Sequence, residues 1–485
     1  MMTASVSAFQ LLPAVGRHLR LAFLLLLVSG LAAATDRPRV LVTTDGEVDD
    51  ECSMVRFLLY ANEWDVEAII NSSSQYHWQG SKLWAGTDWV HRYLDAYQAV
   101  HANLVRHDPR YPTAEFLRSR LYVGNIKAEG EMEEITPGSQ RIVEVLLDRR
   151  DPRPVWVQAW GGTNTLARAL KTIEEQHPDR REEVARKLRL YLIWEQDDTY
   201  QRYIRPNWGR FGIQTIISDQ FIVFFYHWKK YLPARQQTFL AAPWMNTHIL
   251  ENHGPLCARY PARRAGEPGF AAGDFRSEGD SAAFLHTVPN GLRSEASPDW
   301  GGWGGRFVRV RENTWLDPVS EPGYQYPDGR WYTQTAWGRA RLRKEIPNDA
   351  ALTAYLEPQW RWLEAIQNDF AARADWCVKE FKEANHAPVV TVAGPLHRTV
   401  RPGQRVDLVA SATDPDGDTL TCLWWQYAEA DSADARVTIE AADSRDRAYF
   451  TVPREPGRQI HIILEVTDRG APPLVAYQRL VFDIR

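Results

Sequence analysis

A group of acidic residues follows a short apolar run near the start of the chain. Residues 39–44 are rich in β-branched side chains, and Asp45, Asp49 and Asp50 come after them, where an apolar-periodic segment begins at Val48. This order predicts a β-strand, a tight turn and the start of a helix. In an open α/β sheet, ligands bind outside the carboxyl ends of the strands. We therefore expect these carboxylates to converge where such a fold binds its ligand.

Carboxylates this close together repel one another unless a positive charge compensates them. Oxygen ligands of this kind suit Ca²⁺ or Mg²⁺ better than Zn²⁺. An alternative interpretation is that Asp49, Asp50 and Glu51 only complement the dipole of the helix that they open. It does not account for Asp45 at the end of the strand, so we predict a divalent-cation site.

This stretch resembles the signature of the nucleoside hydrolase superfamily, a strand followed by Asp-x-Asp-x-x-x-Asp-Asp. Asp45, Asp49 and Asp50 match the last three aspartates of the signature, while Thr43 stands in place of the first. The sequence is more similar still to a nucleoside-hydrolase-like family of secreted bacterial proteins, some of which are labelled cellulose-binding. Further stretches extend this resemblance over residues 38–385; they are residues 157–167, 278–285, 290–292 and 300–307.

The segments between these motifs alternate strands and helices at the spacing of parallel βαβ units. The resemblance implies an α/β fold over residues 35–385, with a Rossmann-like, mostly parallel sheet and flanking helices. From residue 386 to residue 485, short β-branched runs separated by turn signals predict an all-β sandwich that resembles immunoglobulin-like or cadherin-like modules. Its Asp-Pro-Asp-Gly-Asp segment at residues 414–418 could hold Ca²⁺, but the same residues make a good turn, which we favour.

Residues 1–34 have the pattern of a secretory signal peptide. Basic residues precede an apolar run at residues 21–28, and the alanines at 32–34 offer a small-residue cleavage site. The apolar run is too short to span a bilayer as a helix. We expect a secreted or periplasmic protein without a membrane segment after signal removal. The formal net charge of −5, without a basic block, gives no indication of nucleic-acid binding, and the sequence is compatible with a homo-oligomer.

The resemblance implies a Ca²⁺ ion held by Asp45, Asp50 and Asp280. A main-chain oxygen of Trp160 or, since one gap leaves the register open, of Ala159 would complete the site. It further implies hydrolysis of an N- or O-glycosidic bond, in which the ion lowers the pKa of a bound water and Asp45 accepts the proton.

Two glycines follow Trp160, and Gly161 and Gly162 would let the backbone approach a cation closely. An N-cap at Thr163 or Asn164, with glycine for tight packing, explains the same residues without a ligand.

The family places a histidine directly before its last metal-site aspartate, and this chain has Gly279 there. This departure weakens the case for nucleosides as substrates. Glu278 is a candidate substitute acid, because a desolvated glutamate can have its pKa raised toward neutrality. His253 lies in a turn and could serve as a leaving-group acid, although a single loop histidine more often has no catalytic role.

Substrate contacts are expected on the loops that follow the strands. In the resembled family the second strand end supplies an asparagine, for which Gln75 is the nearest match and Asn71 the alternative. Arg205 and Asn207 lie behind the loop that follows the strand at residues 188–194. The glycine-rich loop at residues 300–305 would form an aromatic rim. The expected substrate-binding residues are Asp49, Gln75, Asn164, Gln196, Asp197, Asp198 and Trp303.

Tryptophan is abundant, with 20 in the chain. Exposed tryptophan in a secreted protein favours a carbohydrate ligand, although core packing uses the same residues for their area. The expected substrate is therefore a polysaccharide or a plant-derived glycoside rather than a nucleoside. The alternative function is non-catalytic carbohydrate binding, for instance of cellulose, which the changes at Thr43 and Gly279 favour and the retained carboxylates oppose.

Overall fold

The computed structural model describes residues 37–218, 224, 226, 228–318, 321–325, 331–334, 356–432 and 436–485. Residues 38–485 form one compact unit. No helix within the described ranges combines the length and the apolar character needed to cross a membrane.

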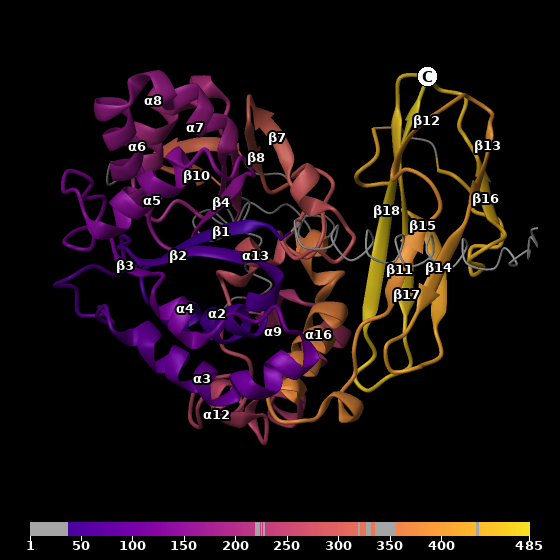
Figure 1. The fold of residues 1–485 in the computed structure, drawn as a ribbon, viewed down its shortest axis with the longest axis horizontal. Helices are drawn as coiled ribbons and strands as arrows, with labels where there is room; N and C mark the ends of the chain where they lie inside the picture. The colour runs from indigo at the N-terminus through magenta and orange to yellow at the C-terminus, as the bar shows by residue number, and fades with distance from the viewer. Residues whose placement is uncertain are drawn as a thin grey trace, which may run out of the picture. The chain divides into compact units, whose positions relative to one another are not determined.

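An eight-stranded sheet forms the centre of the first part of this unit (Figure 1), in the order β3-β2-β1-β4-β5-β6-β8-β7. Neighbouring strands are parallel except for β7 and β8. The strands are β1 (Arg39–Thr44), β2 (Asp65–Asn71), β3 (Leu121–Val123), β4 (Val155–Ala159), β5 (Leu188–Ile193), β6 (Gln214–Ser218), β7 (Val308–Arg311) and β8 (Thr314–Leu316).

The strand order reverses beside β1. The chain leaves β1 toward β2 and β3 on one side and returns to β4, β5 and β6 on the other. Thr44 pairs with Asn71 of β2 and Thr43 pairs with Ala159 of β4, so the carboxyl ends of these strands lie next to one another. Such a reversal is where open α/β sheets bind ligands.

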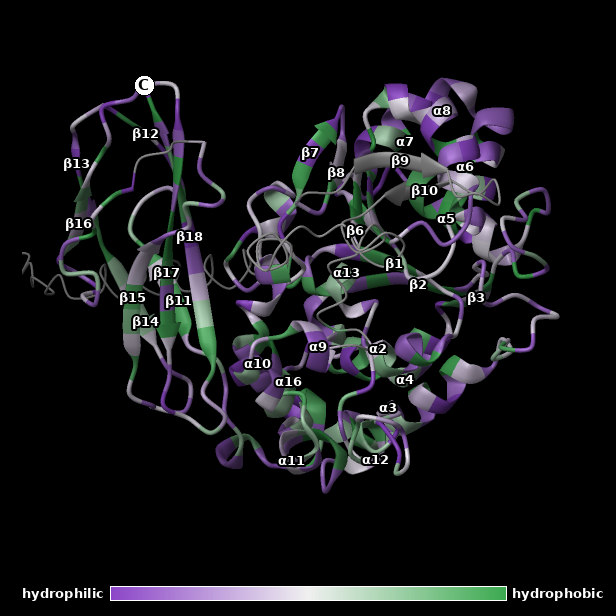
Figure 2. Cartoon of the chain, turned by 180° about the vertical axis from the view of Figure 1, so that it is seen from behind, coloured by the Kyte–Doolittle hydropathy of each residue, from purple (hydrophilic) through white to green (hydrophobic). Residues whose placement is uncertain are grey.

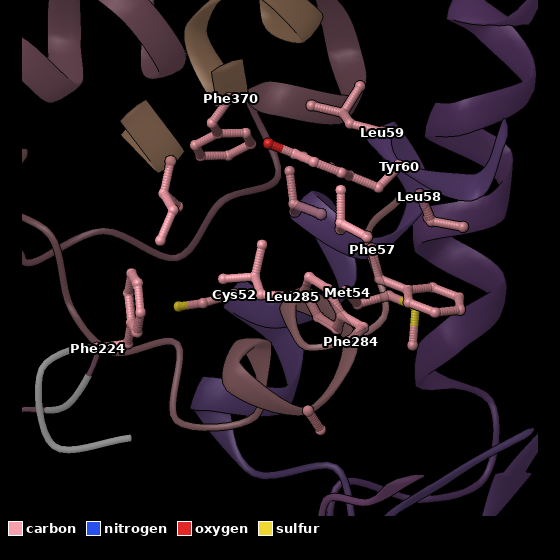
Figure 3. Packing of buried hydrophobic residues seen from close by; sticks show 14 of the residues in the cluster. Cys52, Met54, Phe57, Leu58, Leu59, Tyr60, Phe224, Phe284, Leu285 and Phe370 are labelled. Carbon is pink, nitrogen blue, oxygen red and sulfur yellow. The ribbon is translucent and has the colours of Figure 1, made fainter. Parts of the chain in front are cut away.

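Helices cover both faces of the sheet. Side chains of β1 therefore alternate between two buried clusters, one on each face. Val40 and Val42 pack in one cluster, and Leu41 packs in the other. Figure 3 shows part of the first cluster, where Phe57 lies beside Phe284 with ring centroids 5.6 Å apart. Helices of the first cluster are α2 (Val48–Leu59), α3 (Trp89–His107), α4 (Ala114–Arg118), α9 (Trp228–Tyr231), α11 (Ala242–Met245), α12 (Gly254–Cys257), α13 (Ser281–Leu285) and α16 (Leu363–Trp376).

The second cluster is covered by fewer helices. They are α5 (Pro137–Leu147), α6 (Asn164–Gln176), α7 (Arg181–Lys187) and α8 (Arg205–Trp208). Outside these two groups lie α10 (Ala234–Thr238) and a two-stranded sheet of β9 (Glu321–Gln325) and β10 (Trp331–Gln334).

The last part of the chain is a β-sandwich with its own buried core, to which Trp424, Phe450 and Phe482 belong. Figure 2 shows hydrophobic residues along β17. The expected fold, an α/β sheet followed by an all-β sandwich, is confirmed. The strands are β11 (Val389–Val392), β12 (His397–Val400), β13 (Arg405–Leu408), β14 (Ala410–Thr413), β15 (Thr421–Gln426), β16 (Ala448–Thr451), β17 (Gln459–Thr467) and β18 (Val475–Ile484).

Candidate active site

The turn between β1 and α2 carries the acidic residues of the site. Gly46, which follows Asp45, has φ +78°, and a Cβ atom there would lie 2.9 Å from Nε1 of Trp89. Glycine is required because it tolerates this conformation and this close approach. The backbone N–H of Glu47 donates to Oδ2 of Asp50 at 3.2 Å, which fixes the first turn of α2.

Two groups of potential metal ligands meet at the carboxyl ends of the central strands. Asp49, Asp50 and Asp280 form one group, and Asp45, Glu47 and His77 form the other; within each, the ligand atoms lie within 4.8 Å of one another. Asp280 comes from the N-terminus of α13, far from the others in sequence. Asp50 and Asp280 thus share one group, and Asp45 lies in the neighbouring group, close enough to repel both of them.

These aspartates are buried, and protein donors serve only some of their oxygens; the hydroxyl of Thr44 and the N–H of Glu47, for instance, donate to Asp50. Burial, followed by repulsion from neighbouring carboxylates, raises the pKa of Asp49, Asp50 and Asp280 well above the usual value. Both oxygens of Asp45 and Oδ2 of Asp280 are buried and have no hydrogen-bond partner in the part of the chain that the structure describes. Buried carboxylates need such compensation. This set of oxygen donors therefore fits a hard divalent cation.

Sequence reasoning missed three side chains beside the aspartates. Nδ1 of His77 lies 3.6 Å from Oδ2 of Asp45 and 3.6 Å from Oε2 of Glu47. The hydroxyl of Tyr226 donates to Oε1 of Glu47 at 3.2 Å and lies 3.5 Å from Oδ1 of Asp49. His77 follows β2, the strand next to β1, so its position at a strand end was an available signal. Tyr226 lies in an apolar aromatic stretch that carries no such signal.

These additional residues change the electrostatics of the site. Burial, followed by repulsion from Asp45, raises the pKa of Glu47 to about 6. Burial alone would lower the pKa of His77, but attraction to Asp45 and Glu47 outweighs it, and the net shift is upward. The positive form of His77 is therefore favoured beside the carboxylates.

The loop after β4 packs directly against Asp45. A Cβ atom at Gly161 would lie 2.9 Å from Cβ of Asp45, so only glycine permits this approach. The N–H of Trp160 donates to the carbonyl of Thr43 at 2.9 Å, and its carbonyl accepts from Nε2 of Gln196 at 2.6 Å. The expected main-chain ligand thus lies on a loop that contacts the aspartates, while Ala159 is paired within the sheet.

A family model described as "Cellulose-binding Sde182, nucleoside hydrolase-like domain" matches residues 39–307, more than half of the chain. The chain belongs to this Sde182-like family. A second model, described as the C-terminal domain of cellulose-binding protein Sde0182, matches residues 405–484.

A solved structure supports this assignment. It is a nucleoside hydrolase-related protein from Saccharophagus degradans, described as associated with carbohydrate metabolism. It is 31% identical to this chain, covers 93% of this chain and 100% of its own, and superposes with a TM-score of 0.73.

Other similarities are weak. The type III effector XopQ, in complex with adenosine diphosphate ribose, is 10% identical, with coverage of 68% of this chain and 95% of its own and a TM-score of 0.28. Human CDH23 EC21-23 is 19% identical. It covers 20% of this chain and 35% of its own, with a TM-score of 0.15. Neither supports a statement about this chain, and no curated protein matches it.

Among the expected substrate residues of this Sde182-like protein, Asp49 belongs to the aspartate cluster, and Gln75 and Gln196 lie on the loops after β2 and β5. Oδ1 of Asp49 lies 3.5 Å from the hydroxyl oxygen of Tyr226. The N–H of Gln75 donates to the carbonyl of Gln196 at 2.7 Å, which joins the loops after β2 and β5. The alternative to Gln75, Asn71, instead accepts from Nε1 of Trp89 at 3.0 Å.

Asn164 and Asp197 hold loops together. The Asn164 amide donates to Oγ of Ser73 and to the carbonyls of Asn125 and Glu131, each at 2.9 Å, and its oxygen accepts from Ser72 at 2.9 Å. Asp197 accepts from the N–H of Asn164 at 3.0 Å and from both the N–H and the hydroxyl of Thr199.

These contacts do not favour the expected substrate role of either residue. Their buried polar atoms already have protein partners, as buried polar groups require.

Trp303 differs from expectation, whereas the substrate role of Asp198 stays a prediction. Asp198 forms a partly exposed ion pair with Arg202 at 3.3 Å. Trp303 is 2% exposed and packs in the first hydrophobic cluster, so it cannot form a rim that stacks on a sugar. A glycine-tryptophan loop alone does not show whether its ring points outward or inward.

Glu278 is not placed as a leaving-group acid. Its Oε2 accepts from Nε of Arg56 at 2.5 Å and from Oγ of Ser281 at 2.8 Å. Its Oε1 accepts from Nη2 of Arg56 at 3.1 Å and from the hydroxyl of Tyr260 at 2.9 Å. The carboxylate is fully buried in this ion pair, which corrects the expected catalytic role.

The remaining alternatives also make structural contacts. Nε2 of His253 lies 3.2 Å from Oδ1 of Asp375, and its Nδ1 contacts the carbonyl of Glu251 at 2.6 Å. Arg205 donates to Gln201 and Asn207 donates to the carbonyl of Tyr203; both acceptors lie in the π-helical segment Tyr200–Ile204 that precedes α8.

Proposed function

We propose that this chain is a secreted, Ca²⁺-dependent hydrolase of N- or O-glycosidic bonds that acts at the aspartate cluster. The observation that carries this proposal is the convergence of Asp45, Asp49, Asp50 and Asp280 in a buried site short of donors. Membership of a nucleoside hydrolase-like family supports the reaction class. The cellulose-binding label of the family and the leader-like residues 1–34 support a polymeric or plant-derived sugar outside the cytoplasm.

Asp45, Asp50 and Asp280 would hold the ion, together with a main-chain oxygen of the loop at Trp160. A bound Ca²⁺ would supply positive charge that lowers the pKa of a water and attracts sugar hydroxyls. The choice of Ca²⁺ over a transition metal rests on the all-oxygen character of these ligands.

The protein's own groups suffice for the proton steps. Asp45 has two buried oxygens without a hydrogen-bond partner among the described residues, so one would hold the ion while the other accepts a proton from the attacking water. Asp49 would accept hydrogen bonds from sugar hydroxyls. The ring of His77 and the hydroxyl of Tyr226 lie beside the carboxylates and can carry a proton toward the leaving group.

The second candidate function is carbohydrate binding without turnover. Thr43 and Gly279 replace an aspartate and a histidine of the resembled signature, and Glu278 is held in an ion pair with Arg56. If the leaving group needs a strong acid at that position, the site binds a sugar and does not cleave it.

The test combines calcium calorimetry with hydrolysis assays on nucleosides, aryl glycosides and β-glucans. The proteins are the mature chain, Asp50→Asn, and Asp407→Asn as the matched control at an exposed acidic residue outside the cluster. Loss of calcium binding and turnover in Asp50→Asn alone supports the hydrolase. Calcium binding without turnover of any substrate supports the binding protein, and calcium binding that survives Asp50→Asn contradicts the metal assignment.

A further inference from the structure

A cleft lies away from the aspartate cluster. It has a volume of about 530 Å³ and is formed by the segment that leads into α16 and by strands β15, β17 and β18. Its walls include Glu357, Trp360, Arg361, Trp425 and Glu465. None of its described lining residues belongs to the loops that carry Asp45, His77 or Asp280.

Aromatic rings form the floor of this cleft. Trp362 is 4% exposed and packs with its centroid 6.0 Å from Trp425 and 5.5 Å from Tyr477. Trp360 and Trp425 are half-buried and line the cleft. Buried Trp362 thus supports rings that are only partly covered, a rigid apolar platform with accessible area.

Charged groups of both signs surround the platform. Nε of Arg361 lies 3.1 Å from Oε1 of Glu357, and the guanidinium lies 5.4 Å from the ring centroid of Trp425. Nη1 of Arg361 is buried, makes no hydrogen bond within the described residues and lies 3.7 Å from Oε2 of Glu429. Burial raises the pKa of Glu357 and of Glu465, so both carboxylates are in a poorly solvated environment.

We propose that this cleft binds a neutral oligosaccharide, such as a β-1,4-linked glucan, independently of the aspartate site. A sugar ring has an apolar C–H face for the tryptophans and hydroxyls that both donate to carboxylates and accept from a guanidinium. The three lining glutamates outnumber the two lining arginines, Arg235 and Arg361, so the cleft does not attract a polyanion, and paired charges offer little to a strongly charged peptide. The role of the cleft is to hold a polymer while cleavage, if it occurs, takes place elsewhere.

The test is calorimetric titration of the full mature chain with cellohexaose. It is run in the Asp50→Ala background, which prevents cleavage and removes the proposed metal site. Trp425→Ala is expected to weaken binding by about tenfold or more, because it removes one stacking surface. Glu357→Gln keeps the side-chain shape and is expected to weaken binding with an unchanged circular dichroism spectrum. Trp244→Ala, a half-buried tryptophan that does not line the cleft, is the matched control.

The outcomes separate this inference from the proposed function. The proposed binding site is supported if the Asp50→Ala protein binds cellohexaose and if adding Trp425→Ala or adding Glu357→Gln abolishes that binding. This holds whether or not the chain hydrolyses any glycoside. Absence of cellohexaose binding to the Asp50→Ala protein overturns it. Equal binding by Glu357→Gln, Trp425→Ala and the control also overturns it. If Trp425→Ala fails to fold, Glu357→Gln decides the outcome.

Discussion

Arg56 of α2 and Glu278 form a fully buried ion pair that joins the first helix of the sheet domain to the segment before α13. Nε and Nη2 of Arg56 donate to the two carboxylate oxygens at 2.5 and 3.1 Å. Glu278 is two residues before Asp280 in the chain, so the ion pair fixes the position of an expected metal ligand. Its role is to hold the site in shape, which separates Glu278 from the chemistry.

Glu278→Gln should destabilise the fold, because it leaves the buried guanidinium of Arg56 without its counter-charge. Loss of one partner of a buried pair costs about 3–5 kcal/mol of unfolding free energy. Urea unfolding measures this loss. Arg202→Ala, which breaks the exposed pair with Asp198, should cost less than about 1 kcal/mol. If the Glu278→Gln protein has normal stability but no turnover, the prediction is wrong and Glu278 is again the candidate leaving-group acid.

Gly161→Ala should impair the metal site through Asp45. The added Cβ atom would lie 2.9 Å from Cβ of Asp45, so the carboxylate must move. Displacing a ligand through its supporting residue weakens metal affinity by about 10–100-fold. Calcium titration measures the change. Gly209→Ala is the matched control, because the nearest atom to its new Cβ lies 4.0 Å away, and equal calcium affinities in the two variants would contradict the prediction.

Calcium should raise the melting temperature of the mature protein, and a chelator should reverse the effect. Binding to the folded state alone adds about 2.7 kcal/mol when calcium is present at 100 times its dissociation constant. Asp280→Asn should abolish most of this shift, because Oδ2 of Asp280 has no hydrogen-bond partner among the described residues. Differential scanning calorimetry makes the measurement, and an equal calcium shift in Asp280→Asn would refute the assignment of that ligand.

Asp375→Asn should destabilise the protein at neutral pH and have less effect in acid. Burial alone would raise the pKa of Asp375, but contacts with His253 at 3.2 Å and Lys379 at 2.9 Å outweigh it and lower the pKa below 3.8. A depressed pKa contributes stability that is present above the unfolded pKa and lost as pH falls through the folded value.

The expected loss for Asp375→Asn is about 1.5–3 kcal/mol at pH 7, and it should shrink below about pH 4. Urea unfolding at several pH values measures it. Asp407→Asn, whose side chain is 66% exposed beside Arg405, is the control and should change stability little at any pH. A pH-independent loss in Asp375→Asn would show that its charge is not what stabilises the fold.

The local sequence determined the strand, turn and helix that carry Asp45, Asp49 and Asp50. Such elements follow from side-chain period, β-branched residues and acidic residues at a helix start, all of which act over a few residues. The alternation of strands and helices likewise predicts the parallel sheet, and the change of pattern after residue 385 predicts the sandwich.

Tertiary packing decided which distant side chains join that turn. Asp280 and His77 reach the site because α13 packs on α2 and because β2 ends beside β1. The same packing pairs Glu278 with Arg56 and buries Trp303, against the roles expected for them. Sequence spacing specifies geometry only along one element, whereas contacts between residues hundreds of positions apart depend on how the buried faces of several elements fit together.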